Sequence, residues 1–325
     1  MRAKYFLCLF VAKMVCLFGC GQSTSIAFLE MNFRLQLPPG LTACTHAAMA
    51  TEFIFHLGGH ESAYLRQAAA EAFALIDQLE GRLSFYRESS DVTRINRAPA
   101  GAEISVSPET LACLALAAEA ARQTGGAFDA FNGRAAIAAK NQQIPLYLVD
   151  APGPQDGDLP GAVVSLHPEA GLVKKLRAGP WLDLGALGKG YALDQAALVL
   201  AEWELTTGCL IAGGSSLRGL GGPGWALEID EGKPALTAPG NFCLGASGFQ
   251  FQPSHIIDAR TGADHSATAR ALVLAPSAAL ADALSTAAML LDERQLARLT
   301  RELPGVASVV VDKIGQRYRH GAPFT

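Results

Sequence analysis

Two side chains near the C-terminus are spaced for divalent-metal chemistry. Asp282 and Thr286 lie four residues apart in the segment ADALSTA, which favours a helix. Side chains at this spacing project from one helix face, with Cβ atoms about 5–6 Å apart. A carboxylate and a hydroxyl are oxygen ligands that suit Mg²⁺, which usually completes its octahedron with water and substrate phosphates. The pair indicates a magnesium site and a nucleotide or pyrophosphate substrate; alternatively, it only decorates an amphipathic helix. The carboxylate is expected to be partly hydrated.

His255 opens the segment SHIIDARTG and is the candidate proton acceptor. A neutral imidazole beside a hydroxyl group can take its proton during nucleophilic attack. The alternative is a structural role, because a histidine ahead of an apolar strand is often held by hydrogen bonds.

The segment WLDLGALGKGYALD, residues 181–194, combines glycines with the start of a predicted helix. Gly185, Gly188 and Gly190 let the backbone approach a ligand closely, and N–H groups at a helix start can meet phosphate oxygens. Lys189 adds a cation that can neutralise a phosphate, although a solvated or ion-paired lysine is also compatible with the pattern.

Further short segments complete the pattern: MAT at residues 49–51, SFY at 84–86, TGGAFD at 124–129, AGGS at 212–215 and ASGF at 246–249. In this order, from about residue 42 to the end, the segments resemble the ApbE family of FAD:protein FMN transferases. The resemblance implies an α+β fold of mixed, largely antiparallel sheets with flanking helices.

The resemblance also implies roles for individual residues. The metal ligands would be Asp282, Thr286 and the backbone carbonyl of Ala186, and His255 would be the base. The residues expected to contact FAD are Met49, Tyr86, Ala127, Phe128, Asp129, Asp183, Lys189 and Ile257. Each also has a structural interpretation, such as a core methionine, a solvated tyrosine or a turn aspartate.

The implied reaction transfers FMN from FAD to a threonine or serine hydroxyl of an acceptor protein and releases AMP, with FAD bound against Mg²⁺. Acceptors in the family are subunits of membrane redox pumps and other flavin carriers. Two alternatives remain open: Mg²⁺-dependent hydrolysis of FAD, and a non-catalytic FAD-binding lipoprotein. The chain departs from the family pattern at Ala50, Ser215, Ala246 and Ala259, so the acceptor and pocket rim are expected to differ.

Periodicity predicts the elements that would position these residues. Strands are expected at 51–57, 269–275 and 306–311, and helices at 63–83, 108–125, 188–203 and 278–291. With 325 residues, 50% hydrophobic and 17% charged, the chain can bury a sizeable core. A net charge of −4 argues against a nucleic-acid partner. Residues 42–325 are predicted to form the transferase domain.

The N-terminus resembles a secretory leader. Arg2 and Lys4 precede an apolar run, and the sequence LFGC ends at Cys20 like a lipoprotein signal, despite Lys13 inside the run. Residues 1–20 are therefore predicted to be a leader and 21–41 a linker. The protein would be anchored by lipid on the periplasmic side of the bacterial inner membrane, or cytoplasmic if translation starts at Met31. The cysteines, scattered without metal spacing, are expected to be buried thiols.

Overall fold

The computed structural model describes residues 33–131, 163–178, 182–222, 224–229, 236–248, 258, 260 and 268–322, together with the backbone of 15–19 and 24–28. Its central element is an eight-stranded sheet in the order β16-β15-β14-β13-β10-β9-β5-β4, in which every pair of neighbours is antiparallel. The strands are β4 (Thr42–Ala48), β5 (Thr51–Leu57), β9 (Gly208–Ala212), β10 (Ser216–Gly219), β13 (Cys243–Gly248), β14 (Thr268–Ala275), β15 (Ala307–Asp312) and β16 (Arg317–His320).

Two smaller sheets accompany it. One has the order β1-β2-β3-β11-β12, from β1 (Val15–Gly19), β2 (Thr24–Phe28), β3 (Phe33–Leu37), β11 (Trp225–Glu228) and β12 (Leu236–Ala238). The other joins β6 (Glu103–Ser105), β8 (Leu172–Lys175) and β7 (Val164–His167). The segment expected to be a linker thus contains strands, and β3 pairs with β11. The alternation of buried and half-buried residues along FRLQL is the sequence signal for this strand.

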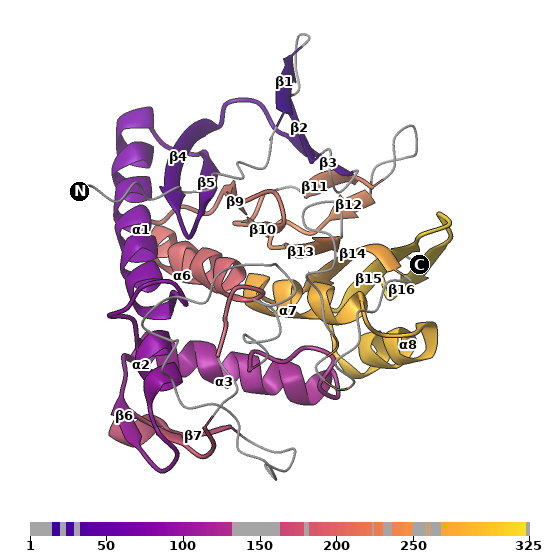
Figure 1. Cartoon of the computed structure of the whole chain (residues 1–325). Helices are drawn as coiled ribbons and strands as arrows, with labels where there is room; N and C mark the ends of the chain where they lie inside the picture. The colour runs from indigo at the N-terminus through magenta and orange to yellow at the C-terminus, as the bar shows by residue number, and fades with distance from the viewer. Residues whose placement is uncertain are drawn as a thin grey trace, which may run out of the picture.

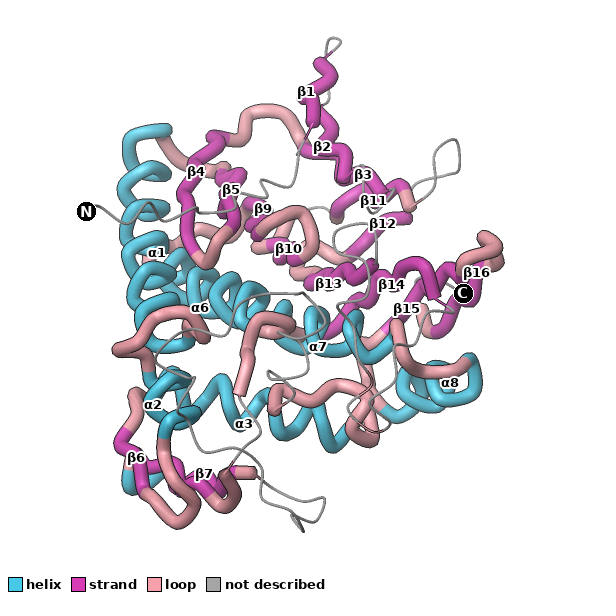
Figure 2. Tube along the Cα trace, viewed as in Figure 1, coloured by secondary structure: helices cyan, strands magenta, loops and turns pink. Residues whose placement is uncertain are grey.

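The helices gather on one side of the large sheet, as Figure 1 and Figure 2 show, and the small sheet with β6 and β7 lies beyond α2 and α3. Those central to the site are α6 (Gly188–Glu202) and α7 (Ala278–Ala288); α6 packs on β9 and β10, and α7 on β13 and β14. The others are α1 (Ser62–Leu83), α2 (Asp91–Arg97), α3 (Pro108–Gln123), α8 (Glu293–Glu302) and a short 3₁₀ turn, Pro168–Ala170. A mixed α+β fold with antiparallel sheets is therefore confirmed.

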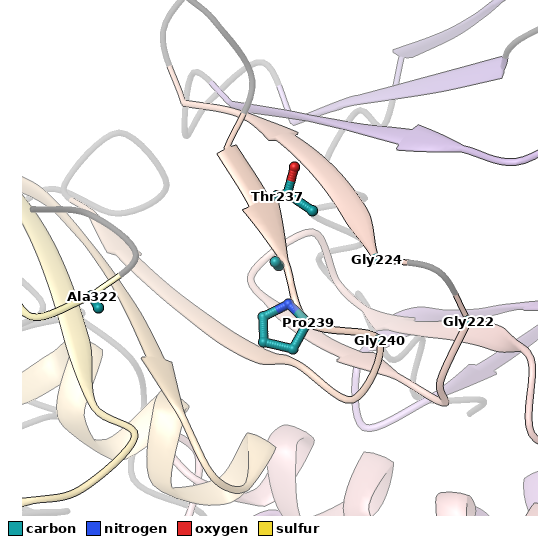
Figure 3. A pocket seen from close by; sticks show the side chains of 7 residues that line it. Gly222, Gly224, Thr237, Pro239, Gly240 and Ala322 are labelled. Carbon is teal, nitrogen blue, oxygen red and sulfur yellow. The ribbon is translucent and has the colours of Figure 1, made fainter.

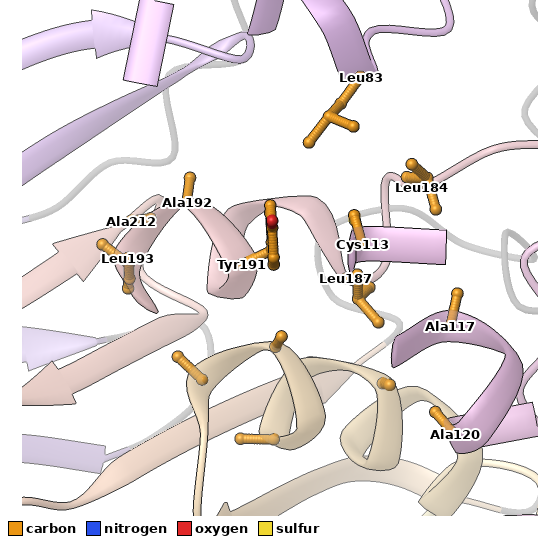
Figure 4. Close-up of a cluster of buried hydrophobic side chains, with 14 of the residues drawn as sticks. Leu83, Cys113, Ala117, Ala120, Leu184, Leu187, Tyr191, Ala192, Leu193 and Ala212 are labelled. Atoms are coloured by element: carbon orange, nitrogen blue, oxygen red, sulfur yellow. The ribbon is translucent and has the colours of Figure 1, made fainter. Parts of the chain in front are cut away.

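The large sheet is covered on both faces, which divides the apolar core in two. One cluster lies between the sheet and the helices; Figure 4 shows part of it, with Tyr191 of α6 and Leu187, the residue before α6, near Cys113 of α3. The other lies between the large sheet and the strands β3 and β11, around Phe33 and Trp225. Burial on both faces explains why β9 is apolar throughout rather than alternating.

Most predicted elements are confirmed within a residue or two, but the last helix is divided. The helix expected at 278–291 ends at Ala288, and α8 begins after Asp292. Asp292 and Gln295 form a reciprocal capping box, a local signal for a second helix that periodicity alone does not reveal. Cys113, Cys209 and Cys243 are buried free thiols, as expected, whereas Cys44 is only half-buried.

A buried histidine on β5 makes the stability of the fold depend on pH. Burial lowers the pKa of His56 from its usual 6.5 to about 4, so between these values the unfolded chain binds a proton that the folded chain does not. Stability is complete above pH 6.5 and falls as the pH drops toward 4. Between pH 7.5 and 5, the free energy of unfolding is expected to fall by about 2 kcal/mol through this residue.

Urea unfolding at the two pH values measures this loss. His56→Gln should remove it, while His167→Gln, at an exposed position, should leave it unchanged. An equal pH dependence in His56→Gln and the unmodified protein would contradict the assignment.

Candidate functional site

Asp282 is buried where α6, α7 and β10 meet. Its Oδ2 accepts hydrogen bonds from the Gly190 N–H and the Ser216 Oγ, each at 2.8 Å. Burial raises the pKa of the carboxyl to about 7, opposed by the charge of Lys189 and by these two donors. The expectation of a partly hydrated carboxylate is therefore wrong: α7 presents this face to the sheet and to α6, and the residue is only 6% exposed.

The two helices are locked together by a reciprocal pair of contacts. A backbone N–H of α6 binds the carboxylate of α7, as described above. In return, Asp194 of α6 accepts hydrogen bonds from the N–H groups of Ala278 and Ala279 at the start of α7, at 3.0 and 2.9 Å. Arg218, two residues beyond Ser216 on β10, pairs with Asp194. β10 thus supplies one donor to each carboxylate.

Two glycines allow the backbones to approach this closely. A Cβ on Gly190 would lie 2.2 Å from the carbonyl oxygen of Ala278, and one on Gly245 of β13 would lie 2.2 Å from that of Ala281. Either contact is far inside the van der Waals limit and involves backbone atoms. The position of Asp282 is therefore fixed by close packing of α7 against both α6 and β13.

Thr286 lies one turn along α7, at the edge of a small group of hydroxyls. Its Oγ1 donates to the Asp282 carbonyl at 3.2 Å, and the Ser285 Oγ donates to the same carbonyl at 2.9 Å. The Ser247 Oγ of β13 lies 2.8 Å from the Ser285 Oγ and 3.4 Å from the Thr286 Oγ1. Thr286 is half-buried, in contrast to its buried neighbours on the helix.

Ala186 lies in the exposed turn that precedes α6. The N–H of Gly190, which is four residues beyond Ala186 and would accordingly donate to its carbonyl in a regular helix, donates instead to Asp282. This N–H group therefore ties the first turn of α6, which follows the Ala186 turn, to the carboxylate of Asp282. Ala186 directly precedes α6, which packs against the helix of Asp282 and Thr286; the metal site itself stays a prediction.

The backbone at Asp183 is hydrogen-bonded to the segment at 127–130. The Asp183 N–H donates to the Ala130 carbonyl at 2.8 Å, and Asp183 Oδ1 accepts from the Gly185 N–H at 2.8 Å. Ala127 and Phe128 have buried side chains, whereas Asp129 is exposed, with one oxygen accepting from the Phe131 N–H at 2.9 Å. The backbone N–H groups of Ala127 and Phe128 both donate to Thr124, at 3.2 and 3.1 Å, so their contacts with FAD stay a prediction.

Asn96, a residue that sequence reasoning missed, fixes the start of the glycine-rich segment. Its buried side-chain amide donates to the Leu182 carbonyl at 2.9 Å and accepts from the Leu182 N–H at 2.7 Å. This double contact ties α2 to the backbone just before Asp183. The same α2 region begins a few residues after Tyr86, which is 55% exposed.

Met49 and Ala50 form the two-residue turn between β4 and β5, both with left-handed backbone, at φ 51° and 57°. The turn lies beside Gly213, where a Cβ would be 2.4 Å from the Thr51 Oγ1. Gly213 lies in the turn that leads into β10, so the hairpin tip is close to the start of the strand whose Ser216 binds Asp282. Met49 also packs against the core, as its structural interpretation predicts.

Ala50 is strained because a left-handed conformation is unfavourable for a residue with a Cβ. Ala50→Gly is expected to raise the free energy of unfolding by about 0.5–1 kcal/mol, the relief exceeding the extra entropy that glycine gives the unfolded chain. Ala47→Gly, at an exposed position on β4, should instead lower it. Chemical denaturation of the three proteins tests the difference, and equal effects of the two substitutions would contradict it.

His255 and Ile257 lie outside the described residues, so their roles stay predictions. The end of the same segment is described. Asp258 is buried and holds Arg260 through two contacts of 2.8 and 2.7 Å. Arg260 lies against Gly126 and its Nη2 is 3.4 Å from the Leu290 carbonyl. Arg260, near the end of the segment that contains His255, therefore lies between Gly126 and the residues just after α7.

In the part of the chain that the structure describes, no group of three or more His, Cys, Asp or Glu side chains is placed to hold a metal. The predicted donor set is of a different kind, with one carboxylate, a hydroxyl and a backbone carbonyl. Figure 3 shows a hollow of about 440 Å³ elsewhere, lined by Gly222, Gly224, Thr237, Ala238, Pro239, Gly240 and Ala322. It contains none of the predicted site residues and offers no charged group.

Comparisons with known proteins cover most of the chain. The model of the ApbE family matches residues 48–310. A curated relative, an FAD:protein FMN transferase from Treponema pallidum, is 27% identical over 77% of this chain and 78% of its own length. The flavin transferase ApbE from Vibrio cholerae has a similar fold, with a TM-score of 0.71 at 20% identity, covering 89% of this chain and 100% of that one. The ApbE protein from Thermotoga maritima gives 0.69 at 21% identity, covering 86% and 97%.

Proposed function

The chain belongs to the ApbE family, and from this membership we propose that it is an FAD:protein FMN transferase. The observation that supports the proposal is the junction of α6 and α7, where the Gly190 N–H in the first turn of α6 donates to Asp282 and Thr286 donates to the Asp282 carbonyl. The curated relative from Treponema pallidum supports the same activity. The reaction would transfer FMN from FAD to a protein hydroxyl and release AMP.

The donor set at this junction fits magnesium. Carboxylate, hydroxyl and carbonyl oxygens are hard ligands, and a site with few protein ligands leaves room for substrate phosphates. Both hydrogen bonds to the carboxylate of Asp282 end on Oδ2, so the described residues leave Oδ1 as the oxygen for the ion. When bound, Mg²⁺ would neutralise charge on the FAD pyrophosphate.

The protein's own residues would bind and orient FAD and the acceptor hydroxyl. The N–H groups of Gly188 and Gly190 already donate to Leu184 and Asp282, so the attraction for an anion would come from the dipole at the start of α6 and from Lys189, whose charge lies near Asp282. The exposed ring of Tyr86 offers a planar surface for a flavin or adenine. Met49, the backbone at 127–128, Asp129, Asp183 and Ile257 would complete the FAD contacts, and His255 would accept the proton of the attacking hydroxyl.

The acceptor is proposed to be a protein that presents a threonine or serine, in a membrane redox subunit or another flavin carrier. Attack of that hydroxyl oxygen on the FMN phosphorus would form the new P–O bond as the bond to AMP breaks. This phosphoryl transfer needs little covalent chemistry from the enzyme, so alignment and charge neutralisation would supply most of the rate.

The test uses purified protein with FAD and Mg²⁺, with and without a fragment of a flavin-carrying acceptor. Transfer predicts flavin fluorescence that stays with the acceptor band in a denaturing gel, together with AMP in equal amount. AMP and FMN formed at the same rate without acceptor would instead establish hydrolysis. Intact FAD that is bound and never cleaved would establish a binding protein and refute the transferase.

We further propose that Cys20 carries a lipid anchor on the periplasmic side of the inner membrane. None of the helices in the described residues is long and apolar enough to cross a membrane, and the support for an anchor is the leader-like sequence that ends at Cys20. Expressed in a bacterium, Cys20→Ser should move the protein from the membrane to the soluble fraction. Soluble behaviour of the unmodified chain would favour a start at Met31 and a cytoplasmic enzyme.

A further inference from the structure

Ser247 occupies a distinctive position on β13. Every other residue of the strand is buried, whereas Ser247 is half-buried. Gly245 and Ser247 lie two residues apart, on the strand face that contacts α7: the first meets the backbone of Ala281, and the second reaches Ser285 and Thr286, a turn further along. The spacing agrees, because two strand residues and one helical turn both advance about 6 Å.

The protons of the three hydroxyls can be assigned by counting. Each hydroxyl has one hydrogen. Those of Ser285 and Thr286 are used on the Asp282 carbonyl, which can only accept. The 2.8 Å contact between Ser247 and Ser285 therefore requires Ser247 to be the donor.

In this assignment, the hydroxyls of Ser247 and Thr286 lie close together, but neither directs its hydrogen toward the other. The Oγ of Ser247 and the Oγ1 of Thr286 are 3.4 Å apart. The first donates its hydrogen to Ser285 and the second donates its hydrogen to the Asp282 carbonyl. Two such oxygens can present only lone pairs to each other, which is unfavourable unless a cation or an external donor lies beside them. Both residues are half-buried in elements that are otherwise largely buried, so the pair lies at the partly exposed edge of the packing between β13 and α7.

The distance between the Ser247 and Thr286 hydroxyl oxygens suits two adjacent ligands of one metal ion. In an octahedron with metal–oxygen distances of about 2.0–2.1 Å, adjacent ligand atoms are about 3 Å apart. The pair of hydroxyls needs to close by only a few tenths of an ångström. Asp282, whose carbonyl holds Thr286 in place, lies on the same helix.

We propose that the Ser247 Oγ is an additional oxygen ligand of the metal, beside Asp282, Thr286 and the Ala186 carbonyl. The inference rests on the proposed function for the existence of the metal site. Two octahedral positions then remain for pyrophosphate oxygens or water. Ser285 has a different role, since its buried hydroxyl connects Ser247 to the Asp282 carbonyl and orients the lone pairs of Ser247.

The test measures metal binding to the full chain without substrate, by electron paramagnetic resonance of Mn²⁺ and by competition with Cd²⁺. Ser247→Ala is expected to weaken Mn²⁺ binding about tenfold, and Ser247→Thr, which keeps the hydroxyl, should restore it. Ser247→Cys should raise the preference for Cd²⁺ over Mn²⁺ at least about tenfold, because a thiolate favours softer metals. Ser285→Cys, in the same cluster, should leave the preference unchanged.

Unaltered metal preference in Ser247→Cys, or native Mn²⁺ affinity in Ser247→Ala, would overturn the assignment, provided that the thermal midpoint shows a folded protein. Asp282→Asn separates this failure from that of the proposed function. Loss of Mn²⁺ binding in Asp282→Asn without a switch in Ser247→Cys would refute Ser247 alone. Full Mn²⁺ binding in Asp282→Asn would refute the metal site as a whole.

Discussion

Replacing Asp282 with asparagine is expected to lower the rate of flavin transfer by about 10³-fold or more, because the site loses its one carboxylate and with it the metal. Asparagine keeps the volume of the side chain and an oxygen that can accept from the Gly190 N–H. The folded protein should therefore survive, and FAD turnover with a saturating acceptor measures the loss. EDTA should reproduce it in the unmodified enzyme, and added Mg²⁺ should reverse it.

Asp282→Ala is expected to destabilise the fold more than Asp282→Asn. The buried N–H of Gly190 and the hydroxyl of Ser216 would lose their acceptor, at a cost of about 1–3 kcal/mol for an unsatisfied buried group. A lower thermal midpoint is therefore expected for the alanine variant and a smaller change for asparagine. Full Mg²⁺-dependent transfer by Asp282→Asn would place the metal elsewhere, with Asp183 and Asp258 as the next carboxylates to test.

Replacing His255 with alanine is expected to reduce transfer by about 10²–10⁴-fold while the affinity for FAD changes little. A general base acts on the acceptor hydroxyl, so its loss lowers the rate of the chemical step rather than substrate binding. Single-turnover rates and FAD titration by flavin fluorescence separate the two quantities. His265→Ala is the matched control, since this histidine lies in the same stretch outside the family motif.

Two outcomes would contradict the base assignment. A variant that loses FAD affinity and transfer in parallel would indicate a binding residue. A variant that no longer folds would support the structural interpretation of His255.

The helices and strands that carry the site could be predicted from the sequence, because they depend on local spacing and capping residues. Asp282 and Thr286 share a helix face through a spacing that is visible in the chain itself, and Ser107 and Pro108 mark the start of α3. Strand 51–57 was predicted with its observed bounds. The helix boundary at Ala288 was missed, although the capping box at Asp292 also depends only on local sequence.

The supporting contacts were not predictable in this way because they join distant segments. Ser216 and Asp282 are 66 residues apart, and Asp194 and Ala279 are 85 apart. Nothing in the spacing of one sequence pairs them. The burial of Asp282 was misjudged for the same reason: the residues that cover it come from α6, β10 and β13, whose order in the sheet is a property of the whole fold.

The reciprocal contacts between α6 and α7 have a kinetic consequence. The amides of Gly190, Ala278 and Ala279 all donate to carboxylates on the opposite helix, so none can exchange its hydrogen with solvent while the helices stay docked. Their deuterium uptake should therefore proceed through one shared opening event rather than through fraying of separate helix ends. Exchange at a helix start is normally fast. Here, slow and matched exchange at these three positions would show that the two helices separate as a unit, and that the candidate site is lost at the same moment.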